Sequence, residues 1–508
     1  MNEKDGVQRS GFGVRRRRRI LVVAWLAVCS AAAAEPARRE LTLADCVGLA
    51  LENNLDLKIE KIVRETAKQE VGAALGGYDP ELSLSAKRTH EEKLGSADEE
   101  AGRLLDESDN DAYAVSVGGA TGLGGLGYEV GAKLGEADGT SSGNPFDAST
   151  GSASVTLTQP LLKGFRTDGT RYQVAVARGQ SAEAAVRLEA KAQDVLAQVE
   201  TAWYALIQAR EDVRVQEDAV RLATQLYEDN RRKVQIGALS ILDEKQAESQ
   251  AAGARAGLGS ARQAYAEAQN QLKSLVFADH RKWRDVEIAA AGELSAEPVA
   301  VDSAASGERA LERRPDLREA RLALQRQGIA VQYQRGQTLP SLDLVGGYGV
   351  AASGEDSRGD VFDRLEAADE PYWTAGVTLA FPLGNRAEKN RYAQSVATAE
   401  KMKLELRRLE EAARVEVDNA ANAVATRLEQ VQATREARAY AEQALVAEQR
   451  KLDSGKSTSF VVLQLQRDVT SARKAEIAAL ADYNQKRSTL ALAEGAILER
   501  LGVEFAAE

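Results

Sequence analysis

Two glycine-rich segments have the residue types of nucleotide-binding motifs. Residues 122–127 have the sequence GLGGLG, the glycine spacing of a dinucleotide fingerprint, which requires a helix to begin at its last glycine. The next residues, 128–131, have a strand-like pattern instead. Residues 454–458, SGKST, are similar to the end of a phosphate-binding loop, but the earlier glycine that such a loop needs falls on Arg450. Both segments therefore predict turns and not nucleotide sites.

Residues that form metal sites and catalytic dyads are scarce. His90 and His280 are isolated in the sequence, and the only cysteines are Cys29 and Cys46. Carboxylates are abundant, but they lie among Lys and Arg in helical patterns typical of solvated coiled-coil flanks. We expect no metal, no cofactor and no enzymatic activity. Cys46 lies on the apolar face of a short helix and is interpreted as a small core residue.

Composition favours an elongated chain. Of the 508 residues, 44% are hydrophobic and 28% are charged, but only 5% are aromatic. Single compact cores stop growing near about 250 to 300 residues, so this length indicates several domains or one very elongated one. The net charge of −11 argues against nucleic-acid binding along the chain. No stretch after the N-terminus approaches 18 uncharged apolar residues, so no transmembrane helix is expected.

The first 34 residues have the parts of a secretory signal. Residues 15–19 are a basic block, 20–28 form an apolar core too short to span a membrane, and 32–34 are a small-residue cleavage site. A twin-arginine signal and lipidation at Cys29 are the alternatives. Cleavage removes seven basic and two acidic residues and leaves a net charge of −16. Cys46 would then be the one cysteine of the mature chain, so no intramolecular disulfide can form.

The remaining chain contains an internal duplication. Four landmarks recur in the same order, at offsets that fall from 260 to 222 and 218: 50–57 with 310–317, 80–84 with 340–344, 159–162 with 381–384, and Gly237 with Gly455. This order predicts two copies of one unit, residues 35–297 and 298–508. The falling offset places additional residues of the first copy between Pro80 and Pro160.

Each copy is predicted to end in a long helical hairpin. No proline lies between Pro160 and Pro298 or after Pro382, although proline costs about 3 kcal/mol inside a helix. Apolar residues recur with a coiled-coil spacing in both regions: Leu206, Val213, Val220, Tyr227, Val234, and Val417, Ala421, Val424, Leu428, Val431. The predicted helices are 171–236 and 386–454, each roughly 100 Å long, followed by 242–274 and 460–499.

Between the leading helices and these hairpins the period changes to two. Segments 82–87, 155–158 and 375–380 alternate apolar and polar residues, which predicts strands with one apolar face. Segments 113–117 and 128–132, separated by glycines, predict an additional hairpin in the first copy that enlarges the extracellular side. The segments 135–148 and 353–370, rich in Gly, Ser and acids, are expected to be solvent-exposed loops.

Strand number constrains the assembly. Four to six strands per chain cannot close a membrane barrel alone, because bacterial barrels begin at eight strands. Several chains must therefore pool their strands, and the same oligomer would place the helical hairpins side by side in a ring. The predicted fold class is mainly α with membrane β, in which duplicated coiled-coil hairpins continue into a shared β-barrel.

The chain resembles the TolC-like outer-membrane efflux proteins over nearly its whole mature length. The resemblance rests on an ordered set of segments: LTLAD at 41–45 with ALENN at 50–54, TQPLL at 158–162, GALSILD at 237–243, FPL at 381–383 and SGK at 454–456. It implies an outer-membrane exit duct built as a homotrimer, with a twelve-stranded barrel of four strands per subunit and a periplasmic α-helical tunnel. It also implies two partners, a periplasmic adaptor and an inner-membrane transporter of an efflux or type I secretion system.

The same resemblance assigns roles to the hairpin tips. It implies that the tips are the periplasmic entrance and contact the adaptor through the following residues: Gly237, Ala238, Leu239, Ser240, Asp243, Gly455, Lys456, Ser457 and Thr458. In well-known members acidic residues form the tightest ring, and the matching positions here are Val461 and Gln464, whereas Asp243 matches the family's aspartate at the first tip. We therefore expect a constriction lined by apolar and amide side chains.

The sequence leaves alternatives open. A periplasmic coiled-coil adaptor would normally have one hairpin, and a structural tether would not explain the period-two segments. Membrane partitioning distinguishes both from a channel. The transported substrate and the class of pump are not readable from the residues, although the acidic charge favours a cation-preferring pore.

Overall fold

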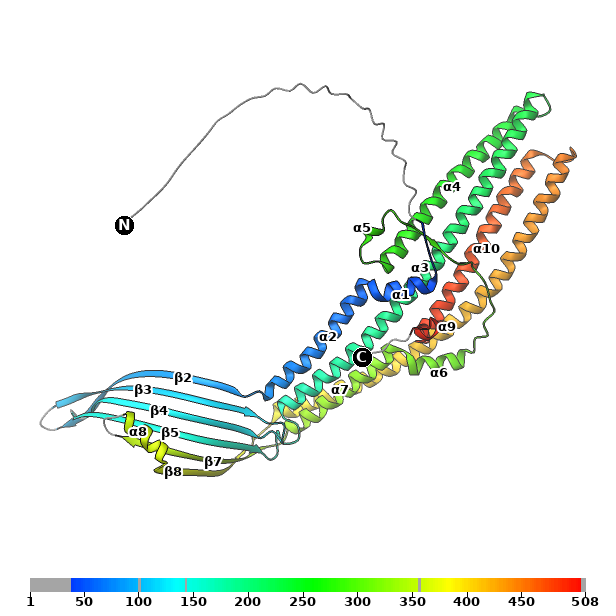
Figure 1. Ribbon diagram of the computed structural model, residues 1–508. Helices are drawn as coiled ribbons and strands as arrows, with labels where there is room; N and C mark the ends of the chain where they lie inside the picture. Colours follow the sequence, from blue (N-terminus) through cyan, green and yellow to red (C-terminus); the bar gives the residue numbers. More distant parts are fainter. Residues whose placement is uncertain (1–37, 99–101, 142–143, 355–357, 504–508) are drawn as a thin grey trace, which may run out of the picture.

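The computed structural model describes residues 38–98, 102–141, 144–354 and 358–503. The predicted signal segment, with Cys29, lies outside these residues. Figure 1 shows an elongated molecule, with a sheet at one end and the tips of two helical hairpins at the other. None of the described helices combines the length and the apolar character that a membrane crossing would require.

Each copy of the duplicated unit begins with two helices. In the first copy these are α1 (Leu43–Asn53) and α2 (Leu55–Leu75), and in the second α6 (Ser303–Arg313) and α7 (Pro315–Gln337). The caps at the starts of α1 and α6 also correspond at the offset of 260. Thr42 forms a capping box with Asp45, and the Asp302 carboxylate accepts hydrogen bonds from two backbone N–H groups.

The long hairpins form as predicted. They consist of α3 (Gly169–Gln235) with α4 (Ile241–Val276), and α9 (Arg386–Asp453) with α10 (Ser459–Ala493). The last helix ends earlier than expected, because Gly495 takes a positive φ of 68° and a short helix α11 (Ile497–Arg500) follows. A Cβ at Gly495 would lie 2.9 Å from the backbone of Arg313, so only glycine fits this turn.

Each copy has its own apolar core, where the leading helices meet the hairpin. In the first copy Leu206 and Ile207 pack with Leu272 and Val276, and Cys46 is fully buried among them. Burial raises the pKa of the Cys46 thiol to about 12, so the thiol is neutral, as expected of a core residue. In the second copy Tyr483 is fully buried and donates a hydrogen bond to the carbonyl of Glu297.

Short elements complete the middle of the molecule. The strands β1 (Arg38–Leu41) and β6 (Glu287–Ala290) pair in parallel, which the sequence did not lead us to expect. The other two elements are the 3₁₀ helix η1 (Gly76–Tyr78), which leads into the sheet, and α5 (His280–Trp283).

The main sheet is antiparallel and has six strands in the order β2-β3-β4-β5-β7-β8. The bounds are β2 (Glu81–Asp98), β3 (Gly102–Ala120), β4 (Gly127–Ser141), β5 (Asn144–Pro160), β7 (Ser341–Gly354) and β8 (Glu370–Ala380). The four strands implied by the family resemblance are therefore too few. The two additional strands are β3 and β4, which lie between Pro80 and Pro160, as the falling offset predicts.

The additional hairpin lies within the main sheet. The turn between β3 and β4 lies at the end of the sheet next to the helices, so β3 and β4 run the length of the sheet with the other strands (Figure 1). The additional hairpin is therefore part of the sheet along its length, and an enlarged extracellular side stays a prediction.

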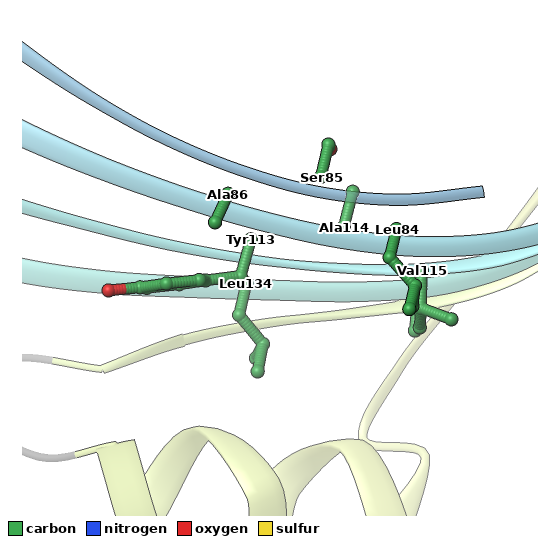
Figure 2. Close-up of a pocket in the computed structure, with 8 residues that line it drawn as sticks. Leu84, Ser85, Ala86, Tyr113, Ala114, Val115 and Leu134 are labelled. Carbon is green, nitrogen blue, oxygen red and sulfur yellow. The ribbon is translucent and has the colours of Figure 1, made fainter.

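The sheet has two unlike faces. The apolar face carries one residue from every strand at a similar level: Leu84, Val115, Val130, Val155, Leu344 and Val377. The polar face carries Ser85, Ser116, Lys133, Ser154, Asp343 and Thr378. Figure 2 shows this separation, with Leu84, Val115 and Leu134 pointing to one side and Ser85 to the other. Membrane barrels have this alternation, with the apolar face toward lipid.

The apolar face changes character away from the helices. Arg88, Asp111 and Glu136 lie side by side in register, and charged residues continue beyond them.

Two segments that were expected to be loops contain regular structure. The segment 135–148 belongs mostly to β4 and β5. The segment 353–370, also expected to be a loop, contains α8 (Arg358–Ala367). Val361 of α8 is buried on the apolar face against Gly151, where a Cβ would lie 2.6 Å from it.

Candidate functional site

The first hairpin tip connects α3 to α4. Gly237 has a φ of 73°, and the N–H of Ala238 donates to the carbonyl of Lys233, which together end α3 with a left-handed glycine turn. Leu239 follows, and Ser240 caps α4 by accepting a hydrogen bond from the N–H of Leu242 at 3.1 Å. The turn at Gly237 is therefore a local property of the sequence.

The second tip, between α9 and α10, has the same turn but a different cap. Gly455 has a φ of 75°, and the N–H of Lys456 donates to the carbonyl of Lys451. Thr458 precedes α10 without a side-chain cap. Ser457 instead donates to the carboxylate of Glu448, at 2.5 Å.

A buried amide connects the two tips. Asn230 on α3 is completely buried, and its Nδ2 donates to the carbonyl of Asp243 at 3.2 Å. Its Oδ1 accepts a hydrogen bond from the hydroxyl of Ser459 at 3.0 Å, across 229 residues of sequence. Val462 and Leu463 pack in the same apolar cluster as Leu226. The tips therefore form one unit within the chain. Sequence analysis missed Asn230 because its contact with Ser459 joins residues that are remote in the sequence.

The two residues at the expected constriction lie on the exposed side of α10. Val461 and Gln464 are both exposed, whereas Val462 and Leu463 face the first hairpin. Asp468, one turn beyond Gln464, is also exposed. Their helical spacing places all three on one strip of α10 that the described chain leaves uncovered.

Large apolar side chains are exposed around both tips. At the first tip Ile236 is 80% exposed and Ile241 is 68% exposed, next to exposed Leu242; at the second tip Phe460 is 57% exposed. Exposed apolar groups clustered at the end of a long projection are typical of a protein contact surface. Asp243, also assigned to this surface, is only partly exposed.

The GLGGLG segment forms a turn, as predicted. Gly124 and Gly125 have positive φ angles in the connection between β3 and β4. The side chain of Arg171, in the first turn of α3, donates to the carbonyl of Gly122, and Gln159 donates to that of Gly124 at 2.8 Å. The turn is therefore fastened to the junction between the sheet and the helices, and no helix begins at its last glycine.

One histidine has neighbours that its sequence position does not reveal. The Nδ1 atom of His90 lies 2.7 Å from a carboxylate oxygen of Asp109, and Nε2 lies 3.4 Å from Glu92 and 3.8 Å from Glu107. Within the described ranges, the exposed group His90, Glu92 and Glu107 is the one found whose ligand atoms are close enough to share a metal ion. Glu107 and Asp109 lie next to His90 because β2 pairs with β3. His90 seemed isolated because the sequence alone does not show this pairing.

Comparisons with known proteins agree with this architecture. A family model described as outer membrane efflux protein matches residues 46–276 and 307–496. No curated protein matches the chain. Solved structures with a similar fold include the Campylobacter jejuni CmeC outer membrane channel, at 17% identity and a TM-score of 0.66, with 90% of this chain and 86% of that chain covered.

Two further structures are similar. The outer membrane protein VceC of Vibrio cholerae is 16% identical, with a TM-score of 0.65 and coverage of 89% of this chain and 96% of that one. The open state of the Neisseria gonorrhoeae MtrE outer membrane channel is 17% identical, with a TM-score of 0.61 and coverage of 90% and 89%. Likeness at this identity shows the fold, and the two family matches together span most of the sequence. The chain therefore belongs to the outer membrane efflux protein family.

Proposed function

We propose that this chain is the exit duct of an efflux or type I secretion system in the outer membrane. One observation carries the proposal: a six-stranded sheet with an apolar and a polar face continues directly into two long helical hairpins in the same chain. The apolar face suits lipid and the polar face suits an aqueous lumen. The helices then extend the duct into the periplasm as a tunnel when copies assemble as a homotrimer.

We further propose that the hairpin tips contact a periplasmic adaptor, which connects the duct to an inner-membrane transporter. The side chains of Ile236, Ile241 and Phe460 support this proposal, because they are apolar and the described chain leaves them largely exposed. Val461 and Gln464 would line the constriction when three copies bring their α10 helices together. We also propose the division into a signal segment 1–34 and repeats 35–297 and 298–508.

The proposal is tested by fractionating cells that express the full chain, with an alkaline wash of the outer membranes before immunoblotting. We expect the mature protein to stay in the washed outer-membrane pellet, because its strands lie in lipid. A known outer-membrane barrel and a soluble periplasmic protein serve as controls. Recovery in the soluble periplasm or in the wash would contradict a channel and favour the alternative, a periplasmic adaptor or tether without a membrane barrel.

A further inference from the structure

We propose that all six strands lie in the membrane and that three copies close a barrel of eighteen strands, in which β2 of one copy pairs with β8 of the next. The proposal rests on the trimeric exit duct proposed above. It differs from the twelve strands implied by the family resemblance, because it gives β3 and β4 the same place in lipid as the other strands.

The first support is that β3 and β4 are fully integrated into the sheet. They pair with β2 and β5 over most of their length, and their apolar residues Val115 and Val130 lie level with Leu84 and Val155 on the apolar face. At the other end, Arg171 and Gln159 hold their turn against the junction with the helices. A hairpin that projected into solvent would need neither the level apolar residues nor this anchor.

The second support is that the sheet is left with two open edges. Within the described residues β2 pairs with β3 alone and β8 with β7 alone. An exposed strand edge promotes pairing with another chain, and barrels abolish edges by closure. Because six is an even number and the strands alternate in direction, β2 and β8 run antiparallel. Copies can therefore join edge to edge without a change in strand direction.

The third support is the stagger of the strands. The hydrogen-bonded register leads from the first residue of β2, Glu81, across the sheet through Gly118, Glu129, Thr156 and Gly347 to Thr374. Thr374 lies six residues before the end of β8 at Ala380, so the five strand pairings accumulate a stagger of six residues. A seam that keeps the strand ends level adds a sixth strand and no further stagger, which gives six residues for six strands. One residue per strand is also the ratio of an eight-stranded barrel of shear 8, whose strands tilt by about 36°. Transmembrane barrels tilt by about 35–45°, so this sheet already has the stagger of a closed barrel.

The same stagger predicts which residues meet between copies. If the strand ends near the helices lie level around the ring, Glu81 of one copy is opposite Ala380 of the next. Leu82 is then opposite Leu379 and Leu84 is opposite Val377, while Ser83 is opposite Thr378. These apolar residues are 61–74% exposed in the single chain. The seam therefore pairs apolar with apolar residues on one face, and it places one hydroxyl pair, Ser83 with Thr378, on the other. Both kinds of cross-strand pair are favourable.

An eighteen-stranded barrel has a functional consequence. Barrel diameter grows roughly in proportion to strand number, so this barrel would be about half again as wide as one of twelve strands. Next to the sheet, each copy still contributes only four of its described helices, α2, α3, α7 and α9 (Figure 1). The duct would therefore widen where it enters the membrane.

The seam can be tested by disulfide cross-linking in outer membranes. Cysteine replaces Thr378 together with one residue of β2 in turn, Ser83, Ser85 or Lys87, so that a shift of register by two residues is still detected. Cys46 does not compete, because it is buried. After oxidation we expect two- and three-chain products on non-reducing gels for at least one pair. The matched control is the pair Ser83→Cys and Thr158→Cys, which would meet within one chain only if β3 and β4 left the sheet and β2 paired directly with β5.

The outcomes separate the possibilities. Cross-linking between β2 and β8 that proceeds to three chains, with none between β2 and β5, supports eighteen strands, and products that stop at two chains overturn that number. Cross-linking of the Ser83→Cys and Thr158→Cys pair within one chain, or none between β2 and β8, overturns the eighteen-stranded barrel. If the expected cross-links do not form but the variants remain in washed outer membranes, the exit duct stands and only the eighteen-stranded barrel fails. If the unmodified chain does not reach that membrane, the exit duct itself fails.

Discussion

The two copies of the repeated unit hold the same corner together with different chemistry. In the first copy Asn54, between α1 and α2, donates from its amide to the carbonyl of Leu275 near the end of α4. In the second copy Arg314, at the corresponding position, donates to the carbonyl of Ala493 at the end of α10. Each residue fastens the bend between two leading helices to the returning arm of its own hairpin. The position of the contact is retained while the side chain changes.

The sheet shows the opposite relationship between the copies. The second copy supplies β7 and β8, whereas the first supplies β2 and β5 at the corresponding places and the additional pair β3 and β4 between them. The helices of the two copies nevertheless have nearly equal lengths, with 67 and 68 residues in α3 and α9. A hairpin can be added because both of its ends connect to strands of the same sheet. An added helix would have to fit among helices that already pack against one another, so the sheet is the part of this unit that can grow.

The largest effect is expected from arginine substitutions on the apolar face of the sheet. They test whether the strands of both copies lie equally in lipid. Val130→Arg in the additional hairpin and Val377→Arg in β8 each place a charge on the apolar face. We expect each to destabilise the assembled barrel by about 2–4 kcal/mol if the site is near the middle of the bilayer. Unfolding by urea in lipid vesicles measures the difference.

Matched variants on the polar face control for the size and charge of arginine. Ser116→Arg in β3 and Thr378→Arg in β8 should have much smaller effects, because these residues lie on the polar face of the sheet. If Val130→Arg cost no more than Ser116→Arg while Val377→Arg remained severe, only the strands shared by both copies would lie in lipid. That result would break the equivalence of the strands.

Smaller effects are expected at the two corners. The Arg314 side chain is only 13% exposed and forms ion pairs with Asp316 at 2.8 Å and Glu416 at 2.7 Å. Arg314→Ala should cost about 1.5–3 kcal/mol, because hydrogen bonds to charged groups are lost and two carboxylates lose their partner. Asn54→Ala removes one neutral hydrogen bond and a helix cap, and should cost about 1 kcal/mol.

Thermal unfolding of the purified protein, followed by circular dichroism, compares the two variants. Arg314→Lys keeps the charge but not the forked geometry, and should fall between the wild type and Arg314→Ala. Equal losses for Arg314→Ala and Asn54→Ala would show that the ion pairs add nothing to the shared contact with the hairpin.

Much of this architecture could be predicted from the sequence, because its signals are local. The absence of proline and the coiled-coil spacing predicted the long hairpins, and Gly237 and Gly455 marked their turns. Alternation predicted the strands only where one face meets apolar surroundings. Beyond Arg88 and Glu136 both faces of the strands are polar, so the pairing continues without a sequence pattern, and segment 135–148 was predicted as loop.

The contacts that could not be predicted depend on remote partners. Asn230 meets Ser459 across 229 residues, and His90 meets Asp109 only because β2 and β3 pair in one particular register. The apolar pattern around Val361 is too short to predict the helix α8 from the sequence. The roles of Val461 and Gln464 remain proposals, because the geometry of a constriction depends on the other copies.

The smallest effect is expected from a change in pH, because only the second tip has a titrating side chain at the corresponding position. Asn230 in the first hairpin corresponds, at the offset of 218, to Glu448 in the second. The amide of Asn230 does not titrate, whereas the Glu448 carboxylate accepts hydrogen bonds from Lys451 at 2.8 Å and from Ser457. The hydrogen bond from Lys451, and then that from Ser457, lower the pKa of Glu448. Its contribution to stability is therefore present above the ordinary range of a glutamate and is lost as the pH falls through its lowered pKa.

As the pH falls below the ordinary titration range of a glutamate and through the lowered pKa of Glu448, we expect the second tip to loosen while the contacts of Asn230 persist. Hydrogen exchange, corrected for the intrinsic rate at each pH, should show lost protection around 448–458 but not around 230–243. Glu448→Gln supplies the control, because an amide at this position should remove the pH dependence of the second tip. Equal loosening of both tips in the acid would mean that the assembly, and not Glu448, responds to pH.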